Sequence, residues 1–223
     1  LAALVGEMDD TIDRALNNLV FAARSAIAAA GIPGIRETVP TFRALAVHFA
    51  PDKIRQEALI AALGEVELPP HPGIRPGKTW QVPVLYDGPD LADVARTLGV
   101  APEDAAALHA SISYHVYMLG FLPGFAYLGD LPQTLRLPRL KEPRTRVPKG
   151  SVAIADQLTA MYPSQSPGGW RLIGRTPLTL FDHTQNPPSL FQPGDLTALG
   201  IETGLGLIDR LGRGELPEAR RLQ

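Results

Sequence analysis

Residues 114–129, YHVYMLGFLPGFAYLG, hold the pattern that decides the fold: apolar strand-like runs separated by Pro and Gly turns. The pattern continues in PRLKEPRTRVPKGSVAIA (138–155) and MYPSQSPGGWRLIGRTPLTLFD (161–182). Proline fixes φ, and glycine permits positive φ and close approach of two backbones, which is how irregular β structure is built. We therefore expect strands at about 114–119, 151–155, 170–174, 178–181 and 196–199, folded into a β-barrel or curled sheet.

The N-terminal segment alternates strand and helix. We expect a strand over 1–5 and then a helix capped by Asp9 or Asp10, because apolar residues repeat at helical spacing up to Ile27 and Gly31 ends the pattern. Residues 38–50, TVPTFRALAVHFA, predict one strand, and a second helix follows Pro51 and stops at Gly64. These elements predict a small sheet covered on one face by two helices.

Residues 69–77, PPHPGIRPG, contain four prolines and two glycines and can extend neither a helix nor a central strand. We place the domain boundary here. The division is an α+β domain over 1–68, a linker over 69–79, a β-barrel domain over 80–203 and a C-terminal tail over 204–223. Short helices are expected at 90–99 and 102–112, where apolar residues again repeat at helical spacing.

Composition narrows the function classes. The chain has 223 residues, 45% of them hydrophobic, and a formal net charge of −2, which gives no electrostatic case for nucleic acid or an acidic membrane surface. The absence of cysteine excludes thiol catalysis, disulfides and Cys-ligated zinc, and agrees with a reducing compartment. No uncharged apolar run approaches the roughly 20 residues that a spanning helix needs, and LAALVGEM at the start has no secretory pattern, so a soluble, cytoplasmic protein is expected.

Familiar catalytic and nucleotide motifs are missing from the sequence. It contains no GxxxxGK[ST], no strand-linked GxGxxG, no GxSxG and no HExxH. The five histidines are scattered, so we expect no metal site. His115 lies within an apolar strand, where a hydrogen-bonded structural histidine is favoured over a general base.

Three groups of residues in the Pro/Gly-rich region suit a small-molecule site, each with a structural alternative. Arg144 and Arg146 are one strand period apart and could clamp an anion, or form a solvated pair. Gly168 and Gly169 could offer backbone N–H groups, or form a tight turn. Aromatic residues alternate around Pro123 and line one apolar surface, for a ligand or for core packing: Phe121, Phe125 and Tyr127.

The ordered strings GFLPGFAYLG, EPRTRVPKGSVAI, YPSQSPGGWRLIGRTPL, LFD and PGD resemble one family. They are similar to the B subunit of the bacterial ATP-dependent 5-oxoprolinase, also known as allophanate hydrolase subunit 1 or the kinase-inhibitor family KipI, which is related to carboxyltransferases. The resemblance is strong from about Trp80 to Ala198, and it remains collinear through the N-terminal segment.

This resemblance implies a fold, a reaction and partners. The fold is α+β, with a ferredoxin-like N-terminal domain followed by a cyclophilin-like β-barrel. The reaction is the opening of 5-oxo-L-proline to L-glutamate coupled to ATP hydrolysis by the complex, and the use of Mg²⁺ with the nucleotide stays open. The partners are a homologous C subunit, similar to allophanate hydrolase subunit 2, and an A subunit. The chain lacks the Met-Lys-Met biotin attachment sequence, so no covalent biotin is expected on it.

Carried over residue by residue, the resemblance assigns a site. Arg144 and Arg175 are expected to bind an anion and act in catalysis. The expected substrate-binding residues form walls and backbone donors: Phe121, Pro123, Phe125, Tyr162, Ser166, Gly168, Gly169 and Trp170. No metal ligand is assigned.

The chain departs from the family after SVAIA. The family has a Gln-Thr-Gly triplet before Tyr-Pro, whereas this chain has Leu158, Thr159 and Ala160. The exchange removes a polar side chain and restricts the backbone where a substrate could lie. Two alternatives therefore stay open beside the hydrolase: a KipI-like protein that inhibits a sensor histidine kinase, and a carboxyltransferase component of a urea carboxylase or allophanate hydrolase system.

Overall fold

The structure is a computed structural model that describes residues 2–8, 12–68, 77–201 and 220–222. The chain divides into two compact units, Leu1–Arg75 and Pro76–Gln223, which we describe separately. The predicted linker falls outside the described residues except for 77–79, and the predicted tail except for 220–222. None of the described helices is both long and apolar enough to cross a bilayer.

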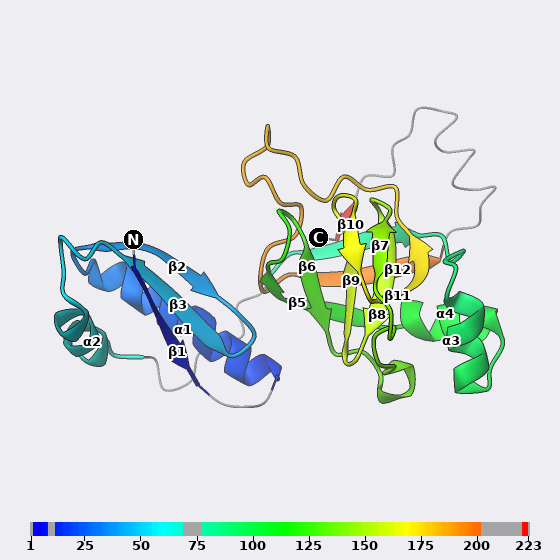
Figure 1. Cartoon of the computed structure of the whole chain (residues 1–223), viewed down its shortest axis with the longest axis horizontal. Coiled ribbons are helices and arrows are strands. Elements are labelled where there is room, and N and C mark those ends of the chain that lie inside the picture. Colours follow the sequence, from blue (N-terminus) through cyan, green and yellow to red (C-terminus); the bar gives the residue numbers. More distant parts are fainter. Residues whose placement is uncertain (1, 9–11, 69–76, 202–219, 223) are drawn as a thin grey trace. The chain divides into compact units, whose positions relative to one another are not determined.

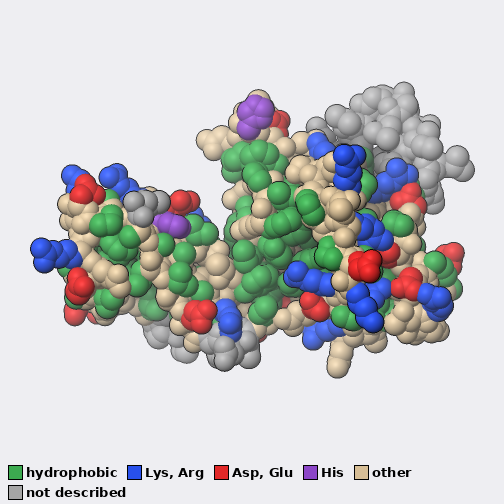
Figure 2. All heavy atoms as spheres, in the orientation of Figure 1, with side chains coloured by type: hydrophobic (Ala, Val, Ile, Leu, Met, Phe, Trp, Pro, Cys, Tyr) green, Lys and Arg blue, Asp and Glu red, His purple; other side chains and the backbone are tan. Residues whose placement is uncertain are grey.

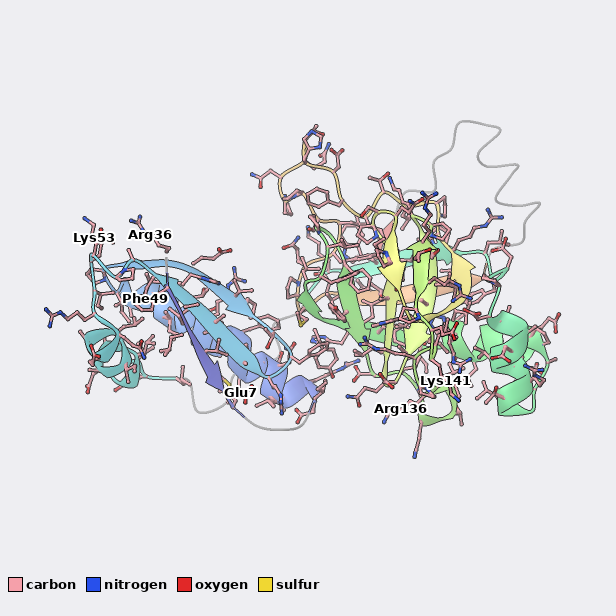
Figure 3. All side chains as sticks on the ribbon, in the orientation of Figure 1. Glu7, Arg36, Phe49, Lys53, Arg136 and Lys141 are labelled. Atoms are coloured by element: carbon pink, nitrogen blue, oxygen red, sulfur yellow. The ribbon has the colours of Figure 1, made fainter. Side chains whose placement is uncertain are left out.

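The first unit is a three-stranded antiparallel sheet with helices packed against it (Figure 1). Its elements are β1 (Ala2–Glu7), α1 (Arg14–Ala30), β2 (Ile35–Pro40), β3 (Ala44–Phe49) and α2 (Gln56–Gly64), with strand order β1-β3-β2. The core joins the apolar stripe of α1 to the central strand and α2; its buried members are Val20, Ala23, Ile27, Leu45, Val47, Phe49 and Leu59. In Figure 3, Phe49 lies on β3 and Glu7 at the end of β1.

Two local predictions for this unit are wrong. The cap of α1 is Asp13, whose carboxylate accepts from the backbone N of Leu16 at 2.8 Å, rather than Asp9 or Asp10. Gly31 does end the helix, in the left-handed conformation with φ of 59°. Residues 38–50 are not one strand, because the chain reverses at Thr41: its Oγ1 accepts from the backbone N of Ala44 at 3.1 Å and closes the β2–β3 turn.

The second unit is built on an eight-stranded sheet with the order β11-β8-β9-β6-β5-β12-β4-β13. The strands are β4 (Thr79–Val84), β5 (Ser113–Leu119), β6 (Ala126–Gly129), β8 (Ser151–Ala155), β9 (Leu158–Met161), β11 (Arg171–Arg175), β12 (Leu196–Ile201) and β13 (Arg220–Leu222). All neighbours are antiparallel except β12 and β4. A separate two-stranded sheet pairs β7 (Arg144–Val147) with β10 (Ser166–Gly168).

The large sheet curls until distant strands meet. Leu85, just after β4, pairs with Arg175 of β11 through two backbone hydrogen bonds of 2.9 and 2.8 Å. A curled sheet in a mixed α/β chain is therefore confirmed, while the names ferredoxin-like and cyclophilin-like stay predictions. The strand predicted at 178–181 is wrong, since only an isolated bridge joins Phe181 to Ser189 there.

Three described helices and the hydrogen bonds of one buried aspartate complete the second unit. The helices are α3 (Leu91–Leu98), α4 (Pro102–Ala110) and the short 3-10 helix η1 (Gln133–Leu135). The aspartate of the PGD string, Asp195, accepts from the backbone N of Lys78 and from Nε1 of Trp80, both at 2.8 Å. This carboxylate ties the start of β12 to the start of β4, which explains the string in structural terms.

The sheet has two different apolar faces because side chains alternate along each strand. On β9, Met161 joins the larger core cluster with Val152 and Ile154 of β8. Ala160 joins a smaller cluster on the opposite face, where the buried residues are Phe125, Val147, Ala153, Ala155, Ala160, Tyr162, Trp170 and Leu172. We call this smaller group the aromatic face.

Candidate functional site

The aromatic face carries four rings in mutual edge contact. Phe125 lies at the centre, with ring centroids 4.9 Å from Tyr127, 5.2 Å from Tyr162 and 6.0 Å from Trp170. Small residues lie beside them on β8 and β9, since Ala153 pairs with Ala160 and Ala160 with Tyr127. The small side chains leave room for large rings on the neighbouring positions.

These rings line a pocket with a volume of about 270 Å³. A space of this size suits a small metabolite, because sites for drug-sized ligands begin at roughly 300 Å³. Ten residues line it: Phe121, Phe125, Tyr127, Arg139, Pro143, Tyr162, Pro167, Gly168, Gly169 and Trp170. The structure thus brings together six of the residues predicted for substrate binding, namely Phe121, Phe125, Tyr162, Gly168, Gly169 and Trp170.

The loop between β5 and β6 contributes Phe121 to the pocket. Phe121 is 62% exposed, has a positive φ of 68°, and contacts Phe125 edge-on at 5.4 Å. A positive φ is costly for a bulky residue, and such backbone strain concentrates at binding and catalytic sites. Gly124 also has a positive φ, and backbone hydrogen bonds from Gly120 to Phe125 and from Phe125 to Leu122 hold the loop.

Arg139 is the one charged residue among those that line the pocket. Its guanidinium lies 5.7 Å from the centroid of Trp170, a cation–π contact. Its Nε is 3.7 Å from Asp156 in an ion pair whose two side chains are about equally exposed. The pocket therefore has apolar walls and a positive edge.

Arg139 belongs to a basic segment between β6 and β8. The segment contains Arg136, Arg139, Lys141, Arg144, Arg146 and Lys149. Figure 3 shows Arg136 and Lys141 at the same end of the second unit, and Figure 2 shows Lys and Arg side chains interspersed with acidic ones over this unit.

Two phenols of the pocket keep their protons at neutral pH. Burial raises the pKa of Tyr162 and of Tyr127, and the positive charge of Arg139 opposes the shift in both. A neutral phenol can donate a hydrogen bond to a ligand oxygen but cannot act as a base. Both phenols therefore keep a proton that a hydrogen bond can use.

Arg144 lies beside the pocket but does not line it. Its Nη2 donates to Oδ1 of Asp90 at 2.6 Å, while its Nη1 is the one buried side-chain nitrogen or oxygen that has no partner within the part of the chain described. Arg175 is mostly exposed and pairs with Asp87 at 2.7 Å. The two predicted catalytic arginines thus hold aspartates in this structure, and their roles toward a substrate stay predictions.

Two further predicted residues lie away from the pocket wall. Ser166 is buried and its hydroxyl donates to the carbonyl of Pro167 at 3.2 Å. Pro123 stands in the β5–β6 loop beside Phe121 but is not among the lining residues. Lining residues that the sequence assignment missed are Tyr127, Arg139, Pro143 and Pro167; the alternation of Phe121, Phe125 and Tyr127 did indicate the first of them.

Leu158, Thr159 and Ala160, where the chain departs from the family, lie on β9 with alternating orientation. Thr159 points away from the aromatic face: its hydroxyl donates to the carbonyl of Ala153 and contacts Nε2 of His109, both at 2.9 Å. Nδ1 of His109 contacts the Tyr86 hydroxyl at 2.8 Å. Thr159 is thus part of a buried polar relay, and it is Ala160 and Leu158 that pack with the aromatic face.

The relay is neutral at physiological pH. Burial lowers the pKa of His109 to about 3 and raises the pKa of Tyr86 and of Tyr114. Among the residues that the structure describes, no group of three or more His, Asp or Glu side chains could hold a metal ion. We therefore assign no metal ligand to the described residues.

Comparison with known proteins places this geometry in a family. A family model described as "Carboxyltransferase domain, subdomain C and D" matches residues 1–191. The chain belongs to the carboxyltransferase domain family. This carboxyltransferase-family chain is 34% identical over 212 residues to the B subunit of 5-oxoprolinase from Bacillus subtilis (strain 168), and the match covers 87% of each chain.

Two further relatives support the same placement. The B subunit of 5-oxoprolinase from Escherichia coli O157:H7 is 50% identical over 118 residues, which are 52% of this carboxyltransferase-family chain and 54% of the relative. The crystal structure of TTHA0988 is similar with a TM-score of 0.80 and 34% identity over 91% of this chain. The match spans only 40% of the TTHA0988 chain. The resemblance to the 5-oxoprolinase B subunit read from the sequence is confirmed.

Proposed function

We propose that this chain is the B-type subunit of a heteromeric, ATP-dependent amidohydrolase that opens 5-oxo-L-proline to L-glutamate. The observation that carries the proposal is its 34% identity to a 5-oxoprolinase B subunit over 87% of both chains. The pocket on the aromatic face supports it, because its volume of about 270 Å³ suits a ligand of that size.

The chemistry of the pocket fits a small ring that carries one negative charge. 5-Oxo-L-proline is a five-membered lactam with a carboxylate. Its ring would pack on Trp170 and Tyr127, whose centroids are 6.0 Å apart, and Arg139 supplies a cation at the edge. A guanidinium is well suited to a carboxylate because its N–H groups form a fork that matches the two oxygens.

The proposed reaction uses ATP to turn a stable amide into an electrophile. The lactam oxygen attacks the γ-phosphorus, the new O–P bond forms, and the bond to ADP breaks. Water then adds to the activated ring carbon, and the ring C–N bond breaks as the amine takes up a proton. A second water hydrolyses the resulting acyl phosphate to the side-chain carboxylate of glutamate and free phosphate. Phosphorylation of the lactam oxygen removes the amide resonance and makes the ring carbon electrophilic, and phosphate is then a good leaving group when water hydrolyses the acyl phosphate.

A partner is part of the proposal. Two residues that line the pocket are exposed, with 62% of Phe121 and 60% of the Arg139 side chain accessible. A similar fold makes up 40% of the longer TTHA0988 chain. We therefore assign the remaining site components, including the nucleotide site and any Mg²⁺ bound with it, to a homologous C subunit and an A subunit. The compartment proposed for the complex is the cytoplasm.

The test is reconstitution of the purified chain with C-type and A-type subunits. We expect glutamate release from 5-oxo-L-proline that needs ATP and all three chains, with one ADP formed per glutamate. Omission of this chain is the control. Release without ATP would reject the activation step, and release without this chain would reject its membership of the enzyme.

A second candidate is supported by the family match itself. The matched family is a carboxyltransferase domain, so the chain could serve as a carboxyltransferase component that accepts a carboxyl group from a biotin carrier on another protein. The same purified complex distinguishes the two. Transfer of labelled carboxylate from a carboxylated biotin carrier, with no glutamate release, would favour the carboxyltransferase.

A further inference from the structure

Tyr162 is held in the pocket by its backbone and by its ring. Its backbone N donates to the carbonyl of Ser151 at 2.9 Å, and its carbonyl accepts from the backbone N of Gly150 at 2.7 Å. Its ring contacts Phe125 edge-on, and the side chain is buried. The phenol is therefore fixed before any ligand binds, and preorganised donors bind ligands without a further ordering cost.

The hydroxyl of Tyr162 is available to a ligand. Tyr162 lines the pocket, and its hydroxyl makes no hydrogen bond to any residue that the structure describes. It is not among the buried unpartnered atoms, of which Nη1 of Arg144 is the one found in the described ranges. The hydroxyl is therefore not fully enclosed by the protein, and a polar atom without a protein partner needs one from water or ligand.

Gly168 sets the position of that hydroxyl. A Cβ added at residue 168 would meet the Tyr162 hydroxyl oxygen closer than 3.0 Å, a contact that real Cβ atoms do not show. The φ of Gly168 is not in the left-handed range, so the backbone itself does not require glycine. The missing side chain is therefore explained by the space that the hydroxyl occupies.

Positive charge surrounds the same hydroxyl. Arg139 and Arg144 both act on Tyr162 and favour its negatively charged form, although burial prevails and keeps it protonated. No acidic residue lines the pocket; Asp156, which pairs with Arg139, is largely exposed, and Asp90 pairs with Arg144. A donor beside two cations favours an anionic acceptor over a neutral carbonyl.

We propose that Tyr162 donates a hydrogen bond to the carboxylate of a small ring carboxylic acid whose ring lies on Trp170 and whose charge faces Arg139. Gly168 is the positioning residue for this donor. The identity of the ring acid rests on the proposed function. The site itself recognises the carboxylate and not the lactam. Recognition of the substrate by this chain is thus separate from activation of the amide.

The test measures binding to the full-length chain by tryptophan fluorescence or calorimetry. Three probes are used: 5-oxo-L-proline, cyclopentanecarboxylate, which lacks the amide, and 2-pyrrolidinone, which lacks the carboxylate. Wild type is expected to bind the two carboxylates with similar Kd values and 2-pyrrolidinone at least about tenfold more weakly. Tyr162→Phe keeps the ring and is expected to raise Kd for both carboxylates by about tenfold or more, as for loss of a hydrogen bond to a charged group.

Gly168→Ala is expected to weaken carboxylate binding in the same way, because it displaces the hydroxyl without removing it. The matched control is Gly200→Ala in β12, where the nearest atom to an added Cβ is 3.9 Å away and binding should not change. Equal Kd values for wild type and Tyr162→Phe, tight binding of 2-pyrrolidinone, or no carboxylate binding to wild type would each overturn the inference. Thermal melting of each variant checks that the fold is retained.

The two proposals fail in different experiments. If the reconstituted complex releases no glutamate while carboxylate binding still depends on Tyr162, the proposed function falls and the carboxylate site stands. If glutamate is released and Tyr162→Phe leaves both Kd and KM unchanged, the carboxylate site falls and the proposed function stands.

Discussion

Arg144 and Asp90 form a mostly buried ion pair that joins three elements. Nη2 of Arg144, on β7, donates to one carboxylate oxygen of Asp90 at 2.6 Å, and the other oxygen accepts from the backbone N of Leu172, on β11, at 2.7 Å. Asp90 immediately precedes α3, and Val94 of that helix donates to its carbonyl. Arg144 therefore stabilises the fold, in addition to any role in binding an anion.

The first prediction concerns this pair. Arg144→Ala is expected to lower the free energy of unfolding by about 3 kcal/mol, because it leaves a carboxylate in a largely buried position without its cation. The control is Arg175→Ala, whose pair with Asp87 is exposed and should contribute less than about 1 kcal/mol. Urea unfolding measures both, and equal losses would contradict the structural role. If Arg144 also binds an anion, complexes that still assemble with Arg144→Ala should lose activity.

The second prediction concerns acid stability. His109 has a pKa lowered by burial to about 3, whereas an unfolded chain protonates the residue near its ordinary value of 6.5. Below about pH 6.5 the unfolded state therefore binds a proton that the folded state does not, and stability falls as the pH falls toward 3, by about 1.4 kcal/mol per pH unit from this residue. Above pH 6.5 this contribution is constant.

Comparison with His109→Gln isolates the effect from the titration of carboxylates. Glutamine can donate to Thr159 and accept from Tyr86, but it does not titrate. Urea unfolding of both proteins at pH 7 and pH 4.5 should give a smaller loss of stability for the variant. Identical pH slopes would show that His109 is not the responsible group.

The third prediction concerns the β5–β6 loop. Gly124 has a φ of +80°, and an added Cβ would lie 2.6 Å from Cβ of Phe181. Gly124→Ala is expected to destabilise the fold by about 2 kcal/mol or more, from backbone strain together with the clash. Gly99 has a similar φ of +71° but no atom within 4 Å of an added Cβ, so Gly99→Ala should show the strain alone, about 1 kcal/mol. Melting curves that shift equally would argue against the clash.

The fourth prediction concerns the positive edge of the pocket. In a reconstituted complex, Arg139→Gln is expected to raise KM for 5-oxo-L-proline by about tenfold or more, since it removes the one cation that lines the pocket. Lys141→Gln removes a nearby charge of the same basic segment that does not line the pocket, and it should change KM less than about twofold. A similar rise in both variants would indicate a general charge effect in place of a specific contact.

The sequence predicted those strands and helices whose ends depend only on residues adjacent in the chain. The strand at 151–155 was predicted with its observed ends, because Gly150 precedes it and Asp156 follows an uninterrupted apolar run. The hairpin within 38–50 was missed because its turn contains neither glycine nor asparagine. A threonine side chain closes it, and such a turn leaves little trace in a sequence.

The site was predicted less well, for a reason that lies in its long-range contacts. The aromatic walls follow from strand alternation and could be read locally. The sequence could not show which arginine faces the pocket, because the contacts of both arginines are long-range. Arg144 pairs with Asp90, 54 positions earlier, and Arg139 contacts Trp170 in a later part of the chain. Spacing along a strand indicates which side chains lie on the same face, but it does not indicate which aspartate pairs with which arginine.

The two faces of β9 have a consequence for how this family diversifies. Thr159 and Met161 belong to the buried relay and the main core, whereas Leu158 and Ala160 pack with the aromatic face and the adjacent Tyr162 lines the pocket. Substitutions at alternate positions of β9 can therefore change what the protein binds, while the residues between them keep the core and the fold. New specificities can arise on this scaffold through changes of a few side chains, with the architecture inherited intact.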